Sequence, residues 1–128
     1  SNPGGCTDYL NQKQKILDTG VTVYELMNEH AVHTKAVLID DDISIVGSYN
    51  LDIRSTYLDT ELMLVIESPE LNEQIRAIEA AYMEKSKEVQ PDGQETAGSL
   101  YKEKTLDKKK QIFYSVLRIL VRPFRHLL

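Results

Sequence analysis

Four short runs of β-branched and other apolar residues, bordered by two helical patterns, constrain the fold of this chain more than any other feature. The runs span residues 21–27, 33–40, 43–47 and 61–67, and each predicts a strand. Asp41-Asp42 separates the middle two runs and predicts a two-residue hairpin turn, although the usual glycine is absent. Strands and helices that alternate within 128 residues predict an α/β unit with a single sheet.

We expect one helix before these strands and another after them. Thr7 has the side chain of an N-cap for a helix over residues 7–19, and Gly20 is placed to end that helix. Ser68-Pro69-Glu70 supplies an N-cap, a proline at the first helical position and an acid near the positive end of the helix dipole. The second helix, expected to run to about residue 88, carries apolar residues at helical spacing: Leu71, Ile75, Ile78 and Tyr82.

Charge and composition divide the chain into three parts. Residues 1–101 have a charge balance of −11 and residues 102–128 one of +6, so the net charge of −5 is an average over two different segments. Residues 90–99 are rich in proline, glycine and small polar residues, which is typical of a linker. We therefore expect a folded unit over 1–89, a linker over 90–105 and a basic segment over 106–128.

Several classes of protein are excluded by composition. Cys6 is the single cysteine, so no internal disulfide can form, and no Cys/His cluster has zinc spacing. The longest apolar runs are far shorter than a membrane span. Residues 1–5 have neither the basic nor the apolar region of a signal peptide.

Four polar residues near the central hairpin form the most informative pattern. His33 and Lys35 are two apart on a predicted strand, so both side chains leave the same face. The hairpin can return Ser48 and Asn50 beside them. Such a cluster offers a nucleophile or base, a fixed positive charge and neutral donors, without the carboxylate pair that a metal would require. It suits an anionic substrate handled without a metal, and phosphate is the obvious candidate.

Each of these residues alone has an ordinary structural explanation. A histidine on a strand is most often a core or surface residue, a lone lysine such as Lys35 extends to solvent, and Gly47 and Asn50 are common in turns. The combination favours a functional interpretation, because six such identities at fixed spacing are expected by chance about once in a million chains of this length.

The pattern His33-x-Lys35-x4-Asp40-x6-Gly47-Ser48-x-Asn50 resembles the HKD motif of the phospholipase D superfamily at every motif position. The similarity continues through residues 50–55 (Asn-Leu-Asp-Ile-Arg-Ser) and 58–61 (Leu-Asp-Thr-Glu), which resemble bacterial cardiolipin synthases and related proteins. Asp59 departs from that pattern, because those enzymes often have asparagine there. The resemblance covers about residues 7–88 and implies a phospholipase D-like unit with a mixed β-sheet flanked by helices.

The resemblance implies a role for each residue of the motif. His33 would attack phosphorus as the nucleophile or protonate the leaving alcohol as the general acid. Lys35 and Asn50 would bind the non-bridging phosphate oxygens, and Ser48 would support this pocket by hydrogen bonding. Glu61 would accept a hydrogen bond from the catalytic imidazole and orient it. No metal and no cofactor are implied.

The other motif residues are expected to be structural. Asp40 lies at the hairpin, where it would bond to the backbone or to basic neighbours. Asp52 and Arg54 would stabilise the loop over residues 51–60 that walls the site, and Gly47 would serve the turn. Two further histidines, His30 and His126, match no part of the motif.

The mechanism of this family uses two copies of the motif, and this chain contains one. One histidine forms a phosphohistidine, and the other protonates the leaving group and then activates the second alcohol or water. We expect residues 1–89 to be the C-terminal catalytic half of a two-motif enzyme, whose N-terminal half lies in the same parent chain. A one-motif protein that pairs with a second copy of itself is the alternative. The isolated chain is then expected to be inactive unless it dimerises.

Residues 106–128 predict an amphipathic helix that Pro123 should end near residue 121. One side collects apolar residues: Phe113, Val116, Leu117, Leu120, Val121 and Phe124. The other side collects Arg118, Arg122 and Arg125, preceded by Lys108-Lys109-Lys110. This pattern is typical of a helix that lies on an anionic membrane surface. Packing of the apolar side on the N-terminal half of the enzyme is the alternative.

The leading functional hypothesis is a cardiolipin synthase-like phosphatidyltransferase or phosphodiesterase that acts on phospholipid. The alternative is an HKD-family nuclease or other phosphodiesterase working as a homodimer, but the acidic balance of residues 1–101 disfavours a nucleic acid partner. A non-catalytic scaffold is disfavoured because every motif residue is present. We expect peripheral membrane association, with any transmembrane segment in the N-terminal part of the parent chain. The lipid headgroup, the acceptor and the membrane face stay open.

Overall fold

The computed structural model describes residues 3–27, 32–103 and 108–121. The chain forms two compact units, one over residues 32–82 and one that joins residues 1–31 to residues 83–128. Each unit contains a three-stranded antiparallel sheet with helices, so the expected α/β class is confirmed.

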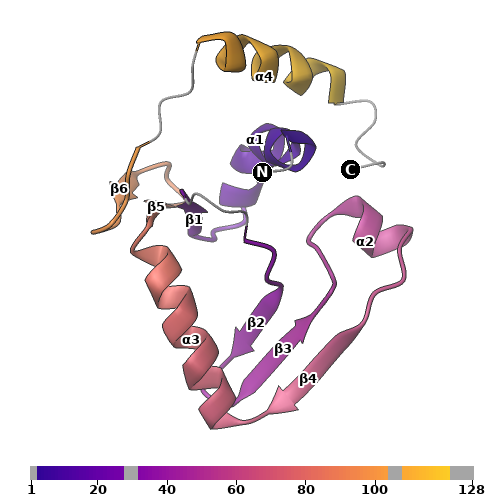
Figure 1. Cartoon of the computed structure of the whole chain (residues 1–128), viewed down its shortest axis with the longest axis vertical. Helices are drawn as coiled ribbons and strands as arrows, with labels where there is room; N and C mark the ends of the chain where they lie inside the picture. Colours follow the sequence, from indigo (N-terminus) through magenta and orange to yellow (C-terminus); the bar gives the residue numbers. More distant parts are fainter. Residues whose placement is uncertain (1–2, 28–31, 104–107, 122–128) are drawn as a thin grey trace. The chain divides into compact units, whose positions relative to one another are not determined.

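The sheet of the 32–82 unit has the strand order β2-β3-β4 (Figure 1). Its strands are β2 (Ala36–Ile39), β3 (Ile43–Gly47) and β4 (Met63–Glu67). Both pairs are antiparallel, and the register places Val37 opposite Ile45 and Ile45 opposite Val65. The short helix α2 (Ile53–Tyr57) lies in the connection from β3 to β4. Successive strands are therefore sequence neighbours, which keeps the contacts local.

Helix α3 (Pro69–Met83) follows β4 and is fixed to the sheet by polar contacts. Its start has the predicted cap, because the Leu71 N–H donates to Ser68 Oγ at 3.3 Å. Asn72 is 1% exposed, and its Nδ2 donates to the Ile43 carbonyl oxygen at 2.8 Å. A buried amide must have such a partner, so this bond sets where α3 packs.

The β2–β3 hairpin contains three turn residues, because Ile39 pairs with Ile43. The predicted two-residue turn is therefore wrong. Asp40 takes a left-handed conformation, with φ at 51°, and its carbonyl oxygen accepts from Arg76 Nη2 at 2.6 Å. Without glycine, the turn uses an aspartate, one of the few residues that tolerate this region.

Substitution of Asp40 tests the backbone explanation. We expect Asp40→Val to lower the free energy of unfolding by about 1–2 kcal/mol, because a β-branched residue is strained at positive φ. Asp40→Asn should stay within about 0.5 kcal/mol of the wild type, since asparagine also tolerates this conformation. Urea unfolding followed by amide exchange of β3 measures both. Equal losses in the two variants would point to the Asp40 carboxylate instead.

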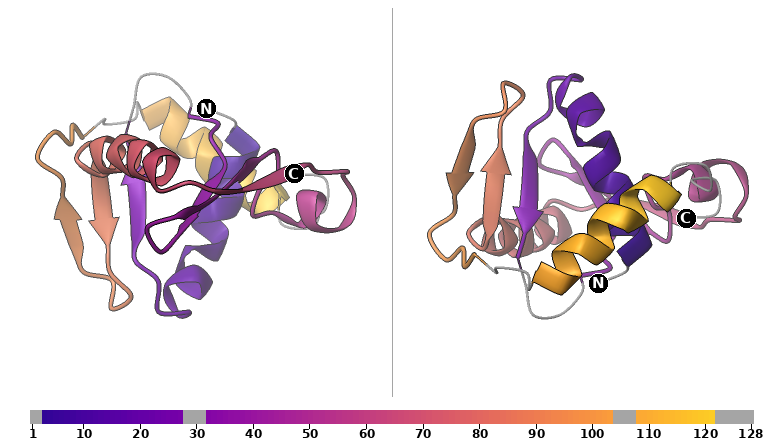
Figure 2. Two further views of the ribbon diagram at one scale, coloured as in Figure 1. Left: turned by 90° about the horizontal axis from the view of Figure 1, so that it is seen from below. Right: turned by 90° about the horizontal axis from the view of Figure 1, so that it is seen from above.

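The second unit has the strand order β1-β5-β6 (Figure 2). Its strands are β1 (Val23–Leu26), β5 (Ser86–Val89) and β6 (Glu95–Ala97). Helix α1 (Pro3–Leu17) precedes them, and α4 (Lys108–Val121) packs against α1. Gly20, with φ at 86°, ends α1 as expected, and its N–H donates to the Leu17 carbonyl oxygen at 2.9 Å.

A network of charges joins α1 to this sheet. Glu25 lies 2.7 Å from Lys13 and 3.3 Å from Lys87, and it accepts a hydrogen bond from the Tyr9 hydroxyl at 2.8 Å. Glu95 pairs with the same two lysines. Partial burial alone would raise the pKa of Glu25, but the bonds from Lys13 and Tyr9 and the lysine charges lower it overall. The stability from Glu25 is therefore present at neutral pH and lost as the pH falls through this lowered pKa.

The structure differs from the sequence-based expectation in four places. The strands are divided between two antiparallel sheets instead of one mixed sheet, because β1 pairs with β5. Residues 86–89, expected at the end of a helix, form β5, where Lys87 lies opposite Glu25. The expected linker over 90–105 contains β6. Thr7 lies inside α1 and is fully buried, so it is not the N-cap.

The basic segment forms a helix as predicted, and α4 spans Lys108–Val121 in the described part of the chain. Its predicted residues Arg122, Phe124 and Arg125 lie outside the described part of the chain. In the described part, no helix is both long enough and apolar enough to span a bilayer.

Candidate active site

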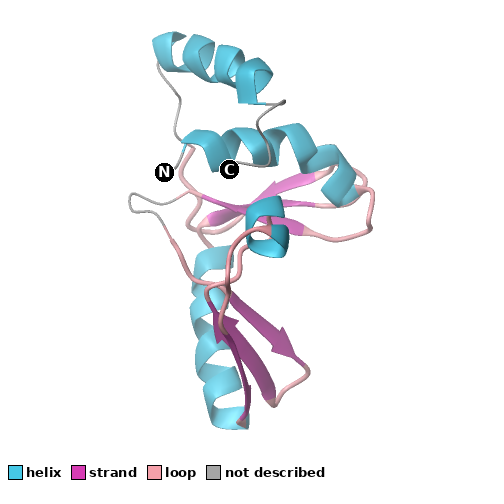
Figure 3. Ribbon diagram, turned by 90° about the vertical axis from the view of Figure 1, so that its right-hand side faces the viewer, coloured by secondary structure: helices cyan, strands magenta, loops and turns pink. Residues whose placement is uncertain are grey.

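Five of the candidate residues gather at one end of the β2-β3-β4 sheet, whereas Asp40 lies in the hairpin turn at the other end. Because neighbouring strands are antiparallel, the start of β2, the end of β3 and the start of β4 meet there, with Gly47 opposite Met63. His33 and Lys35 come just before β2, whereas Ser48 and Asn50 follow β3 and Glu61 precedes β4. Figure 3 shows the short helix α2 at this same end of the three strands. The candidate functional side chains thus lie in the connections at the ends of the strands, and the strands set the positions of these connections.

His33 and Lys35 are in direct contact. The Lys35 ammonium lies 2.7 Å from His33 Nδ1 and donates to the His33 carbonyl oxygen at 3.0 Å. The same ammonium nitrogen lies 3.0 Å from His33 Nε2, so the cation is close to both ring nitrogens. An imidazole beside a fixed cation suits attack on an electrophile next to an anionic oxygen.

Ser48 connects the end of β3 to the start of β4. Its hydroxyl donates to the Glu61 carboxylate, and its Oγ accepts from the Leu62 N–H at 3.1 Å. The Ser48 N–H in turn donates to the Leu62 carbonyl oxygen at 3.0 Å. Ser48 therefore fixes the carboxylate of Glu61 relative to the sheet.

The pKa of Glu61 is lowered from its usual value, mainly by the hydrogen bond from Ser48 and then by one from Ser55, with a further contribution from the charge of Lys35. Glu61 is therefore ionised at neutral pH. Its negative charge lies close to Lys35, although Glu61 is not part of a run of acidic residues in the sequence.

The loop after β3 is held by its own side chains. Asp52 is the N-cap of α2, where its Oδ1 accepts from the Ser55 N–H at 2.7 Å. Arg54 Nε lies 2.9 Å from Asp59 Oδ2, so these two side chains form an ion pair within the loop. Both contacts are local and close the loop over residues 51–60.

Ser55 is a residue whose position in this network the sequence did not reveal. It is 6% exposed, and its Oγ accepts from the Asn50 N–H at 3.2 Å and from Asn50 Nδ2 at 3.4 Å. The same hydroxyl contributes to the lowered pKa of Glu61. One buried hydroxyl thus bonds to Asn50 and influences the carboxylate of the site. The only signal in the sequence was its place at the end of the 50–55 pattern, which does not disclose a bonding partner.

One expected contact is not formed. Among the described residues no hydrogen bond joins Glu61 to His33, whose ring contacts Lys35, while Glu61 is bound by Ser48 and Ser55. Asn50 also directs its side-chain amide to Ser55. The cluster nevertheless unites an imidazole, a cation, an amide, two hydroxyls and a carboxylate. In the same described ranges no three His, Cys, Asp or Glu side chains could hold a metal ion.

The whole arrangement falls within a segment matched by a known family. Residues 2–81 match the family model described as "Cardiolipin synthase, PLD-like domain", which covers more than half of the chain. The chain belongs to this family. The curated relatives of this phospholipase D-like domain include cardiolipin synthase A from Wigglesworthia glossinidia brevipalpis and from Klebsiella pneumoniae subsp. pneumoniae, each 36% identical over 73 residues. Those 73 residues are 57% of this chain and 14% and 15% of the two relatives.

Cardiolipin synthase A from Buchnera aphidicola is 34% identical over 73 residues, again 57% of this chain and 15% of the relative. The chain thus matches only about a seventh of the length of these relatives. No solved structure matches this phospholipase D-like chain significantly.

Substitution of Ser55 tests its place between Asn50 and Glu61. We expect Ser55→Ala to raise the pKa of Glu61 towards its usual value, because one of the two hydrogen bonds that lower it is lost. It should also cost about 1–2 kcal/mol of stability, since the half-buried Asn50 donors lose their acceptor. A carboxyl titration by NMR reports the pKa directly.

Thr56→Ala is the matched control for this experiment. Thr56 is the next residue, and its hydroxyl bonds to the Asp52 carbonyl oxygen without contacting Glu61. An unchanged pKa of Glu61 in Ser55→Ala, or an equal rise in Thr56→Ala, would show that Ser55 does not hold the carboxylate.

Proposed function

We propose that this chain supplies one half of a phospholipase D-type site that transfers a phosphatidyl group from a phospholipid to an alcohol or water, as a cardiolipin synthase would. The observation that carries the proposal is the gathering of His33, Lys35, Ser48, Asn50 and Glu61 at one end of the sheet, within the matched family segment. These groups suit a phosphodiester, whose reaction needs a nucleophile and cations or donors for the non-bridging oxygens.

The proposed reaction has two displacements. In the first, an imidazole nitrogen of His33 attacks phosphorus, an N–P bond forms, and the P–O bond to the alcohol breaks as a second histidine gives that oxygen its proton. In the second, the acceptor loses its proton to that second histidine and its oxygen attacks phosphorus, which breaks the N–P bond and regenerates the imidazole. His33 could equally take the part of the second histidine, because the two halves of the site are equivalent in this scheme.

Lys35 and Asn50 are proposed to bind the non-bridging oxygens in both steps. In the structure they donate to His33 and Ser55, so an arriving phosphate would take over donors that are already close by. Glu61, held by Ser48, is proposed to orient the catalytic imidazole.

The second motif is proposed to come from the N-terminal half of the parent chain, with a second copy of this chain as the alternative. Two observations support a partner. The chain covers only 14–15% of the length of its relatives. In addition, Val37 and Val65, which flank Ile45 across the sheet, are 51% and 70% exposed. An apolar sheet face of this kind is costly in water and favours burial by another part of the enzyme.

A nuclease acting as a homodimer is the competing function. Nucleic acid binding requires several cations along the substrate, because each phosphate contact is electrostatic. The balance of −11 over residues 1–101 argues against this and favours a lipid substrate. A lipid substrate also places the protein peripherally at a membrane surface.

The proposal is tested with the chain and with a chimera, in which residues 2–81 replace the matching segment of the Klebsiella cardiolipin synthase A. Thin-layer chromatography of labelled phosphatidylglycerol should show conversion by the chimera and none by the monomeric chain. Turnover by the monomeric chain at the rate of the chimera would refute the half-site. Conversion that depends on chain concentration to the second order would favour the homodimer.

A further inference from the structure

Among the residues that the structure describes, nothing covers one apolar side of helix α4. Its five most exposed apolar side chains are each between 52% and 71% exposed: Ile112, Phe113, Val116, Ile119 and Leu120. At about 100° per residue these positions fall on one arc of the helix. We call them the exposed α4 face.

The opposite side of α4 is already used. Arg118 Nε donates to Asn11 Oδ1 at 3.2 Å, and Asn11 Nδ2 donates to the Arg118 carbonyl oxygen at 3.2 Å. Tyr114 and Leu117 are half-buried on the side of the helix that carries Arg118. The packing of α4 on α1 therefore uses the side of the helix that carries Arg118 and does not involve the exposed α4 face.

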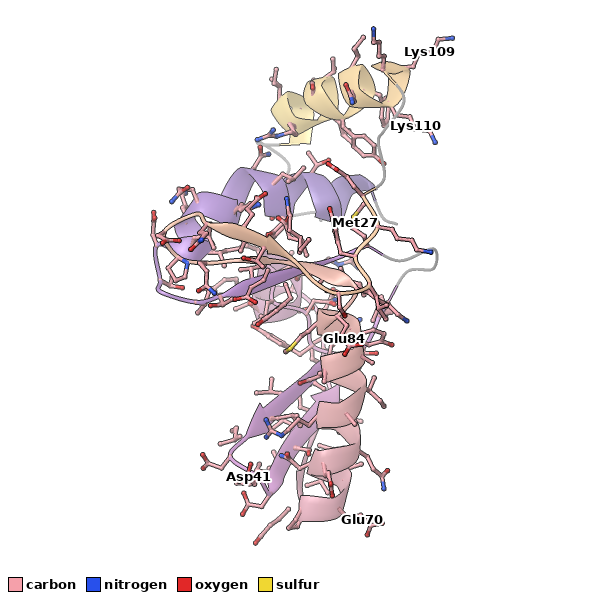
Figure 4. All side chains as sticks on the ribbon, turned by 90° about the vertical axis from the view of Figure 1, so that its left-hand side faces the viewer. Met27, Asp41, Glu70, Glu84, Lys109 and Lys110 are labelled. Atoms are coloured by element: carbon pink, nitrogen blue, oxygen red, sulfur yellow. The ribbon has the colours of Figure 1, made fainter. Side chains whose placement is uncertain are left out.

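This arrangement changes the sequence-based description of the helix. Leu117 was expected on the apolar surface and Arg118 among the lipid-binding cations, but Leu117 is half-buried and Arg118 is bonded to α1. The cations left for a partner in the described part of α4 are three lysines, Lys108, Lys109 and Lys110, all exposed. Figure 4 shows Lys109 and Lys110 projecting from the start of the helix.

The position of these lysines indicates an anionic partner. They occupy the first turn of α4, which has no acidic residue, and the whole helix from Lys108 to Val121 has none. The N-terminus of a helix carries partial positive charge, so three cations there weaken the helix in water. Across the described ranges no carboxylate lies within salt-bridge distance of any of them. An external anion would relieve this repulsion.

We propose that the exposed α4 face binds the surface of an anionic lipid bilayer. Its apolar side chains would enter the boundary between headgroups and acyl chains, and the lysines would contact anionic headgroups. The helix has 14 residues, too few to span a bilayer, so it would lie in the plane of the surface. A surface that is both apolar and purely cationic matches an anionic bilayer better than the same face of a second copy, which would bring its own lysines to the contact.

Vesicle flotation of the chain tests this proposal independently of catalysis, because no turnover is measured. The wild-type chain should float with vesicles of phosphatidylcholine containing about 30% phosphatidylglycerol and much less with phosphatidylcholine alone. The triple variant Lys108→Glu/Lys109→Glu/Lys110→Glu should bind the anionic vesicles about 100-fold more weakly, since each lysine near such a surface contributes about a five-fold gain. Acids at this helix end stabilise α4, so circular dichroism should show no loss of helix.

Two controls and a second variant complete the experiment. Lys15→Glu/Lys85→Glu/Lys102→Glu makes the same charge change at exposed lysines elsewhere and should retain binding within about three-fold. Phe113→Ala/Ile119→Ala removes apolar side-chain area from the exposed α4 face while alanine, the best helix former, preserves the helix. This variant should lower vesicle binding about ten-fold or more. Its control in the other unit, Val37→Ala/Val65→Ala, should leave vesicle binding unchanged.

The outcomes separate the possible partners. Loss of flotation in both α4 variants with retention in both controls supports the lipid surface. Flotation of the triple lysine variant equal to that of the wild type overturns the proposal. So does a wild-type chain that ignores anionic vesicles but sediments as an oligomer that Phe113→Ala/Ile119→Ala disperses, because that result assigns the face to a second copy.

Discussion

Replacing His33 with alanine is expected to lower phosphatidyl transfer by the chimera by about 10⁴-fold or more, whichever of the two histidine roles it performs. As the nucleophile it forms the covalent bond to phosphorus, and as the acid it protonates the leaving oxygen. The structure shows why its bonded neighbour cannot replace it. The Lys35 ammonium beside the ring has no lone pair to attack with.

His30→Ala is the matched control, because His30 lies three residues earlier and outside the motif. We expect it to retain activity within a few-fold of the unsubstituted chimera, measured as initial rates of phosphatidylglycerol conversion. A His33→Ala chimera that keeps a tenth or more of the activity would remove His33 from the chemistry. Equal losses in both variants would indicate a folding defect rather than a catalytic one.

Gly47→Ala is expected to destabilise the 32–82 unit by about 3 kcal/mol or more. A Cβ at this position would collide with the Leu62 carbonyl oxygen and come within 2.9 Å of Met63 Cα. Both atoms belong to the backbone at the start of β4, so they cannot move aside as the nearby Met63 side chain can. Strain here would also displace Ser48, the residue that holds Glu61.

Gly93→Ala is the matched control for the steric argument. Gly93 has φ at 84°, and no atom lies within 4 Å of the position that a methyl group would take there. Alanine should therefore cost only about 1 kcal/mol through the backbone conformation. Amide exchange of β3 and β4, measured against denaturant, reports the stability of the 32–82 unit, and exchange of β5 and β6 reports that of the unit that contains Gly93. Equal costs at the two glycines would show that β3 and β4 do not approach as closely as the structure indicates.

The sequence predicted the elements around the motif well, because their signals are local. The Ser68-Pro69-Glu70 start of α3 and the end of α1 at Gly20 depend on residues within one turn of the helix. The strand over 43–47 follows from its apolar, β-branched composition. Propensity and capping were sufficient for these features.

Pairing between distant segments could not be predicted in the same way. Strand β5 contains serine, lysine and glutamate, and it is stabilised by Lys87 opposite Glu25, a residue far away in the chain. No periodicity within residues 86–89 discloses that partner, so a continuing helix was the natural prediction. The same reason explains why the division of the strands into two sheets was missed.

The site shows the same limit. Motif spacing predicted that His33, Lys35, Ser48 and Asn50 would come together, since an antiparallel hairpin brings them to one end. It did not predict that Ser55 joins Asn50 to Glu61, because this bond depends on how α2 turns the loop back. Nor did it predict that the Lys35 ammonium contacts the imidazole ring of His33.

The most direct test of a lipid phosphatidyltransfer site is a comparison of two substrates in one preparation. The chimera is supplied side by side with labelled phosphatidylglycerol in mixed micelles and with labelled single-stranded DNA, and products of both are counted over the same time. We predict conversion of the lipid, no cleavage of the DNA, and loss of the lipid reaction in His33→Ala. Cleavage of the DNA that requires His33, with the phosphatidylglycerol left intact, would contradict the account.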